Sequence, residues 1–523
     1  MRLIRSTAII SSLTLISRIL GLIRDVFIAR FLGAGVISDA FFTAFKLPNL
    51  FRRMFAEGAF NAAFVPLYAR RLEEEGADSA DAFAREAMAA LLVLVAAIVI
   101  VFELTMPWTL SLIGYGLDRH IDPETGIRPY YLAVLYAQIT MPYLIFMSLT
   151  ALFSGILNTR HYFALAAGVL MTVNVFMIAT LAVTGQMGWP PERLALALAV
   201  AVSLSGIVQM GLVIWGCRRA GVRIGLQRPR LTPGVRRLFV LGVPGLISAG
   251  ITQINLIVSH SIATLKSGAA SWLTYADRLY QLPLGMIGIA MGVALLPALS
   301  RRLRSGDEEG ARLSFNRALE IAAFLTLPAT MALIIMPDFL LAGLFQRGAF
   351  TAETTQQTAK ALTLFACGLP AFVLLKVMTP AFFAREDTKT PMIFAALSAA
   401  INIVLGITFF FTIGFEGLAL ATSIAAWVNV VCLTYSLRKR GDFMPDGRLI
   451  LRIPRILCAC LIMGAVLYVI VPYGQAMLTG RVLHDFPALI LIASIGFVIY
   501  VISAFLFRAF DMSDIKNSFM RTE

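Results

Sequence analysis

The sequence predicts an all-α membrane protein that crosses the bilayer many times. Of its 523 residues 59% are hydrophobic and only 14% are charged, and the mean hydropathy of +0.82 is far above that of soluble domains. Apolar runs of about 20 residues, the length that a helix needs to cross a bilayer, recur along the whole chain. The runs are continuous, whereas a membrane barrel would show short alternating segments.

The apolar runs predict about fourteen transmembrane helices with short polar joins, and no stretch is left for a sizeable soluble domain. The expected spans are residues 7–32, 36–68, 87–112, 130–157, 163–184, 194–216, 238–265, 271–299, 315–336, 358–383, 391–413, 415–436, 453–472 and 486–507.

The first apolar run follows two arginines, as a secretory signal peptide does. However, Arg18 and Arg24 interrupt the run, and no small-residue cleavage site follows it. We therefore expect a retained first helix.

Basic residues set the expected topology. The net charge is +14, and arginines gather in alternate joins such as 218–237, 301–304 and 438–455. The positive-inside rule places these joins and both termini in the cytoplasm. Such a pattern accounts for the basic balance without nucleic acid as a partner.

Two short strings recur at nearly the same distance. Residues 64–72 (FVPLYARRL) align with 295–303 (LLPALSRRL), 231 residues later, and residues 158–160 align with 387–389, 229 residues later. This distance covers six helices, an even number, so we expect a parallel duplication. The predicted parts are an N-terminal lobe (1–220), a basic cytoplasmic linker (221–235), a C-terminal lobe (236–440) and a final helix pair (441–523).

Several charges fall inside predicted spans, where each costs roughly 2.5–3.5 kcal/mol if it faces lipid. We therefore expect them to face a wet cavity or one another. They lie on the first, second and eighth helices: Arg18, Arg24, Asp25, Asp39, Lys46, Arg52, Arg53, Glu57, Asp277 and Arg278.

Helical spacing groups these residues into strips. Ser17, Gly21 and Arg24 share one face of the first helix, and Lys46, Asn49, Arg53 and Glu57 share one face of the second. Arginine from both lobes predicts a phosphate-bearing substrate, because its planar fork bonds phosphate oxygens bidentately. The competing interpretation is that the acids only neutralise neighbouring bases, and that some bases snorkel to the interface.

The chain lacks the motifs of soluble catalysis. It has no G-x-x-x-x-G-K-[ST], no H-E-x-x-H and no G-x-S-x-G string, and its histidines are scattered. The five cysteines favour buried thiols over a disulfide framework. We expect no cofactor, no resident metal and no enzymatic site.

Long motifs resemble the lipid II flippases, the MurJ/MviN family. They are SRILGLIRD at 17–25, DAFFTAFKLPNLFRRMFAEGAF at 39–60, YADRL at 275–279, FQRGAF at 345–350 and DTKTP at 387–391. The resemblance implies the fold of the multidrug/oligosaccharidyl-lipid/polysaccharide exporter superfamily: fourteen helices, two lobes around a cationic cavity, and a final pair bordering a lipid-tail groove.

The resemblance also implies a substrate, the undecaprenyl-diphosphate-linked disaccharide-pentapeptide (lipid II), and residues that bind it. Arg18, Arg24, Arg52 and Arg278 match the family's cavity arginines. We predict that Asp39, Lys46, Ser17, Asn49, Glu57, Asp277 and Tyr275 complete the site. Gln281 departs from the family pattern, since some relatives have an acid there.

The predicted mechanism is alternating access, in which the two lobes rock and the prenyl tail stays in lipid. An inside-negative potential pushes the anionic headgroup outward, and a monovalent cation could reset the carrier. The alternatives are a flippase for another prenyl-diphosphate-linked polysaccharide, a multidrug exporter of the same superfamily, a membrane glycosyltransferase or a non-transporting scaffold.

Overall fold

The structure, a computed structural model, describes residues 2–54, 60–121, 126 and 128–509. Throughout these residues the regular secondary structure is helical, which confirms the predicted fold class. The chain divides into two compact units, unit 1 (Met1–Ser271) and unit 2 (Trp272–Glu523).

Among its described residues, unit 1 contains ten helices and the beginning of an eleventh. Their bounds are α1 (Arg2–Leu32), α2 (Val36–Phe51), α3 (Phe60–Glu74), α4 (Ala77–Ile113), α5 (Pro129–Thr140), α6 (Tyr143–Thr159), α7 (Phe163–Gly168), α8 (Thr172–Thr184), α9 (Pro191–Arg219) and α10 (Pro233–Ala263), with short 3-10 turns η2 (Leu117–Arg119) and η3 (Val169–Met171). Within the unit, α9 packs against α6 and α8, and α1 packs against α7 and α8.

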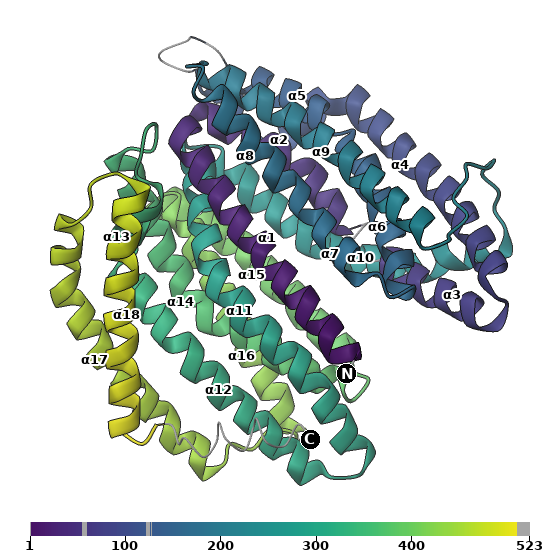
Figure 1. Cartoon of the computed structure of the whole chain (residues 1–523). Coiled ribbons are helices and arrows are strands. Elements are labelled where there is room, and N and C mark those ends of the chain that lie inside the picture. The colour runs from purple at the N-terminus through teal and green to yellow at the C-terminus, as the bar shows by residue number, and fades with distance from the viewer. Residues whose placement is uncertain (1, 55–59, 122–125, 127, 510–523) are drawn as a thin grey trace. The chain divides into compact units, whose positions relative to one another are not determined.

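Up to residue 509, where the described part of the chain ends, unit 2 contains most of α11 (Ala269–Arg304), which starts in unit 1, and seven further helices. Their bounds are α12 (Glu308–Ile335), α13 (Pro337–Phe345), α14 (Ala352–Phe383), α15 (Lys389–Ile413), α16 (Glu416–Lys439), α17 (Gly447–Ala476) and α18 (Val482–Leu506). The final pair, α17 and α18, packs side by side and shares an apolar core with α12 and α13 (Figure 1).

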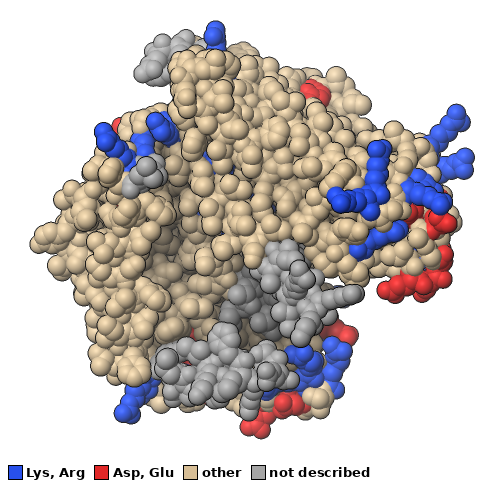
Figure 2. Space-filling view, in the orientation of Figure 1, with Lys and Arg blue, Asp and Glu red and all other residues tan. Residues whose placement is uncertain are grey.

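Ten helical segments among the described residues are long and apolar enough to cross a membrane. The face drawn in Figure 2 fits this, since it is mostly uncharged with Lys, Arg, Asp and Glu near its margins. The predicted count of about fourteen spans is not confirmed by this number. The expected span 36–68 includes residues 55–59, which lie outside the described residues, and its described parts are helical, in α2 and α3.

The two repeated strings are built alike. Residues 64–72 and 295–303 have the same pattern of buried, half-buried and exposed side chains at every position. A glycine with positive φ follows each string, Gly76 at 85° and Gly306 at 75°, in a conformation that other residues adopt at a cost. This agreement supports a duplication.

The helix α10 packs against α3 and α4 inside unit 1. The sequence assigns the same stretch to the second lobe, which is predicted to begin at residue 236. The lobe and linker boundaries stay a prediction, and any division of the chain into lobes has to account for this packing.

Candidate functional site

The polar strip on α1 is built around a buried arginine. The Arg24 side chain, in a residue only 9% exposed, donates from Nε (3.0 Å) and Nη2 (2.7 Å) to the same oxygen, Oδ1 of Asp25. Its third nitrogen, Nη1, donates to Oδ1 of Asn174 on α8 at 2.8 Å. Every nitrogen of the guanidinium therefore has a partner in unit 1.

Asn174 also reaches the preceding turns of α1, because its Nδ2 donates to the carbonyl oxygen of Ser17 at 3.4 Å. The Asn174 amide thus contacts both ends of the strip of Ser17, Gly21 and Arg24 that helical spacing predicts. The sequence analysis missed Asn174. Its only signal there is an amide inside the apolar span 163–184, where a polar side chain needs a partner.

The end of α2 holds two further predicted residues. Asn49 donates to the carbonyl of Phe45 at 3.1 Å, and its Oδ1 accepts from Nε of Arg52 at 3.2 Å. Pro48 lies within α2, and residues 52–54 continue as a π-helical turn. Wider turns of this kind occur frequently at functional sites.

The other cationic residues predicted on α1 and α2, Arg18 and Lys46, are half-buried. Glu57 lies outside the described residues.

Asp39 binds the start of α11. Its carboxylate accepts from the backbone N–H of Gly268 (2.6 Å), the backbone N–H of Ser271 (2.8 Å) and the Ser271 hydroxyl (2.5 Å). One turn further along α2, Thr43 hydrogen-bonds the buried His260 of α10 at 2.9 Å. Both contacts attach α2 to the connection between α10 and α11.

In unit 2 the predicted residues follow one another on α11. Tyr275 is buried, and its ring packs against Phe345 and Phe350 at centroid distances of 5.4 and 5.3 Å. Asp277 accepts a hydrogen bond from Nε2 of Gln281, the residue that departs from the family pattern. Arg278 is half-buried.

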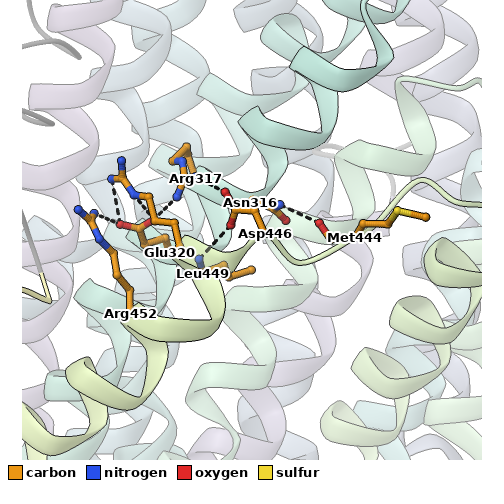
Figure 3. Close-up of polar contacts among 8 residues, drawn as sticks. Asn316, Arg317, Glu320, Met444, Asp446, Leu449 and Arg452 are labelled. Atoms are coloured by element: carbon orange, nitrogen blue, oxygen red, sulfur yellow. Dashed lines mark hydrogen bonds and ion pairs between the residues drawn. The ribbon is translucent and has the colours of Figure 1, made fainter.

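A further buried carboxylate, to which the sequence gives no predicted role, lies on α12. Glu320 is 4% exposed and accepts from three arginines: Arg317 at 2.5 Å, Arg448 at 3.2 Å, and Arg452 (Figure 3). Asp446 accepts from Arg317 and from the backbone N–H of Leu449, and so caps α17. These contacts tie α12 to the beginning of α17.

The described residues contain no group of three or more His, Cys, Asp or Glu side chains suited to a metal ion. Buried or half-buried arginines on α1, α2 and α11, within a chain of many apolar spans, define a polytopic α-helical membrane protein of the transporter class.

A family model described as lipid II flippase MurJ matches residues 28–485, and the chain belongs to this family. A probable lipid II flippase MurJ of Rhizobium meliloti (strain 1021) is 43% identical, over 100% of this chain and 97% of its own length. The lipid II flippase MurJ of Burkholderia cenocepacia is 35% identical, over 85% and 86%.

Solved structures agree with the family. One described as lipid II flippase MurJ in an inward closed conformation superposes with a TM-score of 0.77 at 27% identity, over 95% of this chain and 98% of that chain. An inward-facing multidrug resistance MATE family transporter of the MOP superfamily gives a TM-score of 0.68 at 17% identity, over 81% and 94%. The second likeness concerns the fold alone.

Proposed function

We propose that this chain is a lipid II flippase of the bacterial inner membrane. It moves the lipid-linked peptidoglycan precursor from the cytoplasmic to the periplasmic leaflet, and so serves cell-wall biogenesis and cell shape. The observation that carries this conclusion is the family match across residues 28–485, with relatives of the same name at up to 43% identity.

Arg24 is the proposed anchor for the diphosphate. Its contacts with Asp25 and Asn174 use one N–H from each nitrogen, and Nη1 and Nη2 each carry a second N–H that can donate to phosphate oxygens. Charge-assisted hydrogen bonds to phosphate are among the strongest in proteins. A guanidinium that the protein holds through one N–H of each nitrogen, with two further N–H groups for a ligand, is suited to this role.

We propose two roles for the other predicted residues: some contact the headgroup directly, and others support the residues that do. Direct contact is proposed for the cationic side chains and their neighbours: Arg18, Arg52, Arg278, Lys46, Asn49, Ser17, Glu57 and Asp277. A supporting role is proposed for Asp39 and Tyr275, since Asp39 binds the start of α11 and Tyr275 packs into an aromatic cluster.

Transport is proposed to proceed by alternating access, with both termini in the cytoplasm. The headgroup carries about two negative charges, and an inside-negative potential favours their outward movement by roughly 2.3 kcal/mol per charge per 100 mV. The membrane potential can therefore drive export without a nucleotide, and a monovalent cation is the proposed agent of resetting.

Translocation in proteoliposomes tests the proposed function. Fluorescent lipid II is incorporated with the purified full-length chain, and its exposure in the outer leaflet is followed with a membrane-impermeant quencher. Vesicles with the chain should show lipid II crossing faster than protein-free vesicles, and faster than a fluorescent phosphatidylcholine in the same vesicles. Equal rates for lipid II with and without the chain, with and without an imposed potential, would refute the proposal.

A further inference from the structure

We propose that Asn174 is a positioning residue for transport, which orients the Arg24 guanidinium toward the substrate diphosphate. This inference rests on the proposed function, because it assigns a task to a residue that supports the proposed anchor. Neither the family resemblance nor the sequence pattern singles out this asparagine. It emerges from the hydrogen bonds between α8 and α1.

Asp25 alone does not fix the direction in which the guanidinium points. Both of the Arg24 bonds to Asp25 end on the same oxygen atom, Oδ1. A fork that meets a single acceptor atom can pivot about it, unlike a fork that grips both oxygens of a carboxylate. The bond from Nη1 to Asn174 at 2.8 Å supplies the second fixed point, since it comes from another helix.

The Asn174 amide has only one suitable orientation. Its oxygen faces Arg24, which can only donate, and its nitrogen faces the Ser17 carbonyl, which can only accept. A reversed amide would place an N–H group against the guanidinium and an oxygen against the carbonyl. Since Asn174 is only 6% exposed, such a reversal would cost both bonds without replacement by bulk water.

The amide lies against α1 between its two hydrogen-bond partners. Gly21 lies between Ser17 and Arg24 on the strip, and a Cβ atom there would already touch Nδ2 of Asn174 at 4.0 Å. The predicted strip of α1 therefore does more than carry Arg24. It also forms the surface against which the Asn174 amide of α8 packs.

A double-mutant cycle tests the inference by measuring the Kd of undecaprenyl diphosphate for the full-length chain in lipid nanodiscs. Asn174→Leu removes both hydrogen bonds with little change in volume, and we expect binding to weaken about tenfold, as for the loss of one charge-assisted hydrogen bond. In an Arg24→Ala background the same substitution should cause no further loss. Asn402→Leu, at another buried asparagine on α15, is the matched control and should leave the Kd unchanged.

The outcomes separate this inference from the proposed function. Arg24→Ala without effect on the Kd would remove the proposed anchor itself. Arg24→Ala with an effect and Asn174→Leu without one would overturn only the positioning role, as would an equal loss from Asn174→Leu in both backgrounds, which marks a purely structural residue. Should the leucine variant not accumulate, Asn174→Ala also removes both hydrogen bonds with a smaller side chain. Its loss of affinity should likewise appear only when Arg24 is present.

Discussion

Around Arg24 in unit 1, one guanidinium donates to one carboxylate and to one amide oxygen, whereas around Glu320 in unit 2 three guanidinium groups donate to one carboxylate. The first cluster lies in the C-terminal third of α1 and connects this helix to α8. The second ties α12 to the beginning of α17 (Figure 3). Guanidinium and carboxylate groups thus meet in both units, but in different ratios and at different positions in the fold.

The proportions suggest different tasks. The ion pair of Arg24 and Asp25, with its supporting amide, leaves two Arg24 N–H groups that can serve a ligand. A carboxylate that accepts from three arginines on two helices holds these helices together, because each arginine depends on it to neutralise its buried charge. We therefore propose that the Arg24 cluster binds the substrate and that the Glu320 cluster stabilises the fold.

The largest expected effect is on stability, from Glu320→Gln. This change leaves Arg317, Arg448 and Arg452 without their shared countercharge, and breaking a buried pair in this way costs about 3–5 kcal/mol. Thermal unfolding of the purified variant in detergent should show a much lower Tm. Glu74→Gln, which breaks only the exposed pair with Arg70, is the control and should cost less than about 1 kcal/mol. Similar Tm values for the two variants would break the comparison.

The next effect is on ligand affinity, from Arg24→Lys. Lysine keeps the charge that Asp25 requires but loses the planar fork, so the Kd of undecaprenyl diphosphate should rise about tenfold to a hundredfold while the Tm changes little. The matched change in the other cluster, Arg317→Lys, should lower the Tm and leave the Kd unaltered. If both lysine variants moved the same quantity, the division of tasks would be wrong.

A third carboxylate, Asp39, extends the comparison between the Arg24 and Glu320 clusters to one without arginine. Its donors are backbone N–H groups and a hydroxyl. Asp39→Asn turns one acceptor oxygen into a donor against the N–H of Gly268 or Ser271, which should cost about 1–3 kcal/mol. Denaturation monitored by tryptophan fluorescence would measure this loss. Asp118→Asn, at an exposed pair with Arg128, should be nearly neutral, and an equally neutral Asp39→Asn would deny Asp39 its role at α11.

The smallest expected effect concerns a carboxylate outside the spans. Hydrogen bonds from the Thr390 backbone and hydroxyl, and then from Arg440, lower the pKa of Asp387 from 3.8 to about 2. A lowered folded-state pKa means that this stabilisation is present above about pH 4 and is lost as the pH falls through 2. Asp387→Asn should cost about 0.5–1 kcal/mol at pH 7, and its difference from the unaltered chain should shrink below pH 4 in acid unfolding curves. A constant difference down to pH 2 would contradict the lowered pKa.

Much of the architecture follows from the sequence, because a helix in a bilayer must be continuously apolar and satisfies its own backbone. The final helix pair and the paired strings at 64–72 and 295–303 are examples, and the strings agree in burial position by position. The π-helical turn at residues 52–54, which follows α2 and its Pro48, was not anticipated, since a proline inside a hydrophobic run does not say which turn of a helix widens.

The partners of the charged residues are harder to predict. Helical spacing places Ser17 and Arg24 on one strip, but Asn174 meets them from 150 residues away in the chain. Glu320 and Arg448 are likewise separated by 128 residues, and as single letters they look like ordinary charges near helix ends. Pattern identifies residues that need a partner, whereas only tertiary packing supplies it.

The most direct test of the central claim is the leaflet distribution of lipid II in living cells. The chromosomal flippase is depleted while the cells carry this chain, its Arg24→Lys variant or its Arg317→Lys variant at matched abundance, and lipid II is labelled selectively on the periplasmic side. If Arg24 anchors the diphosphate, lipid II should accumulate in the cytoplasmic leaflet only in the cells that carry Arg24→Lys. Normal periplasmic exposure with that variant would contradict it.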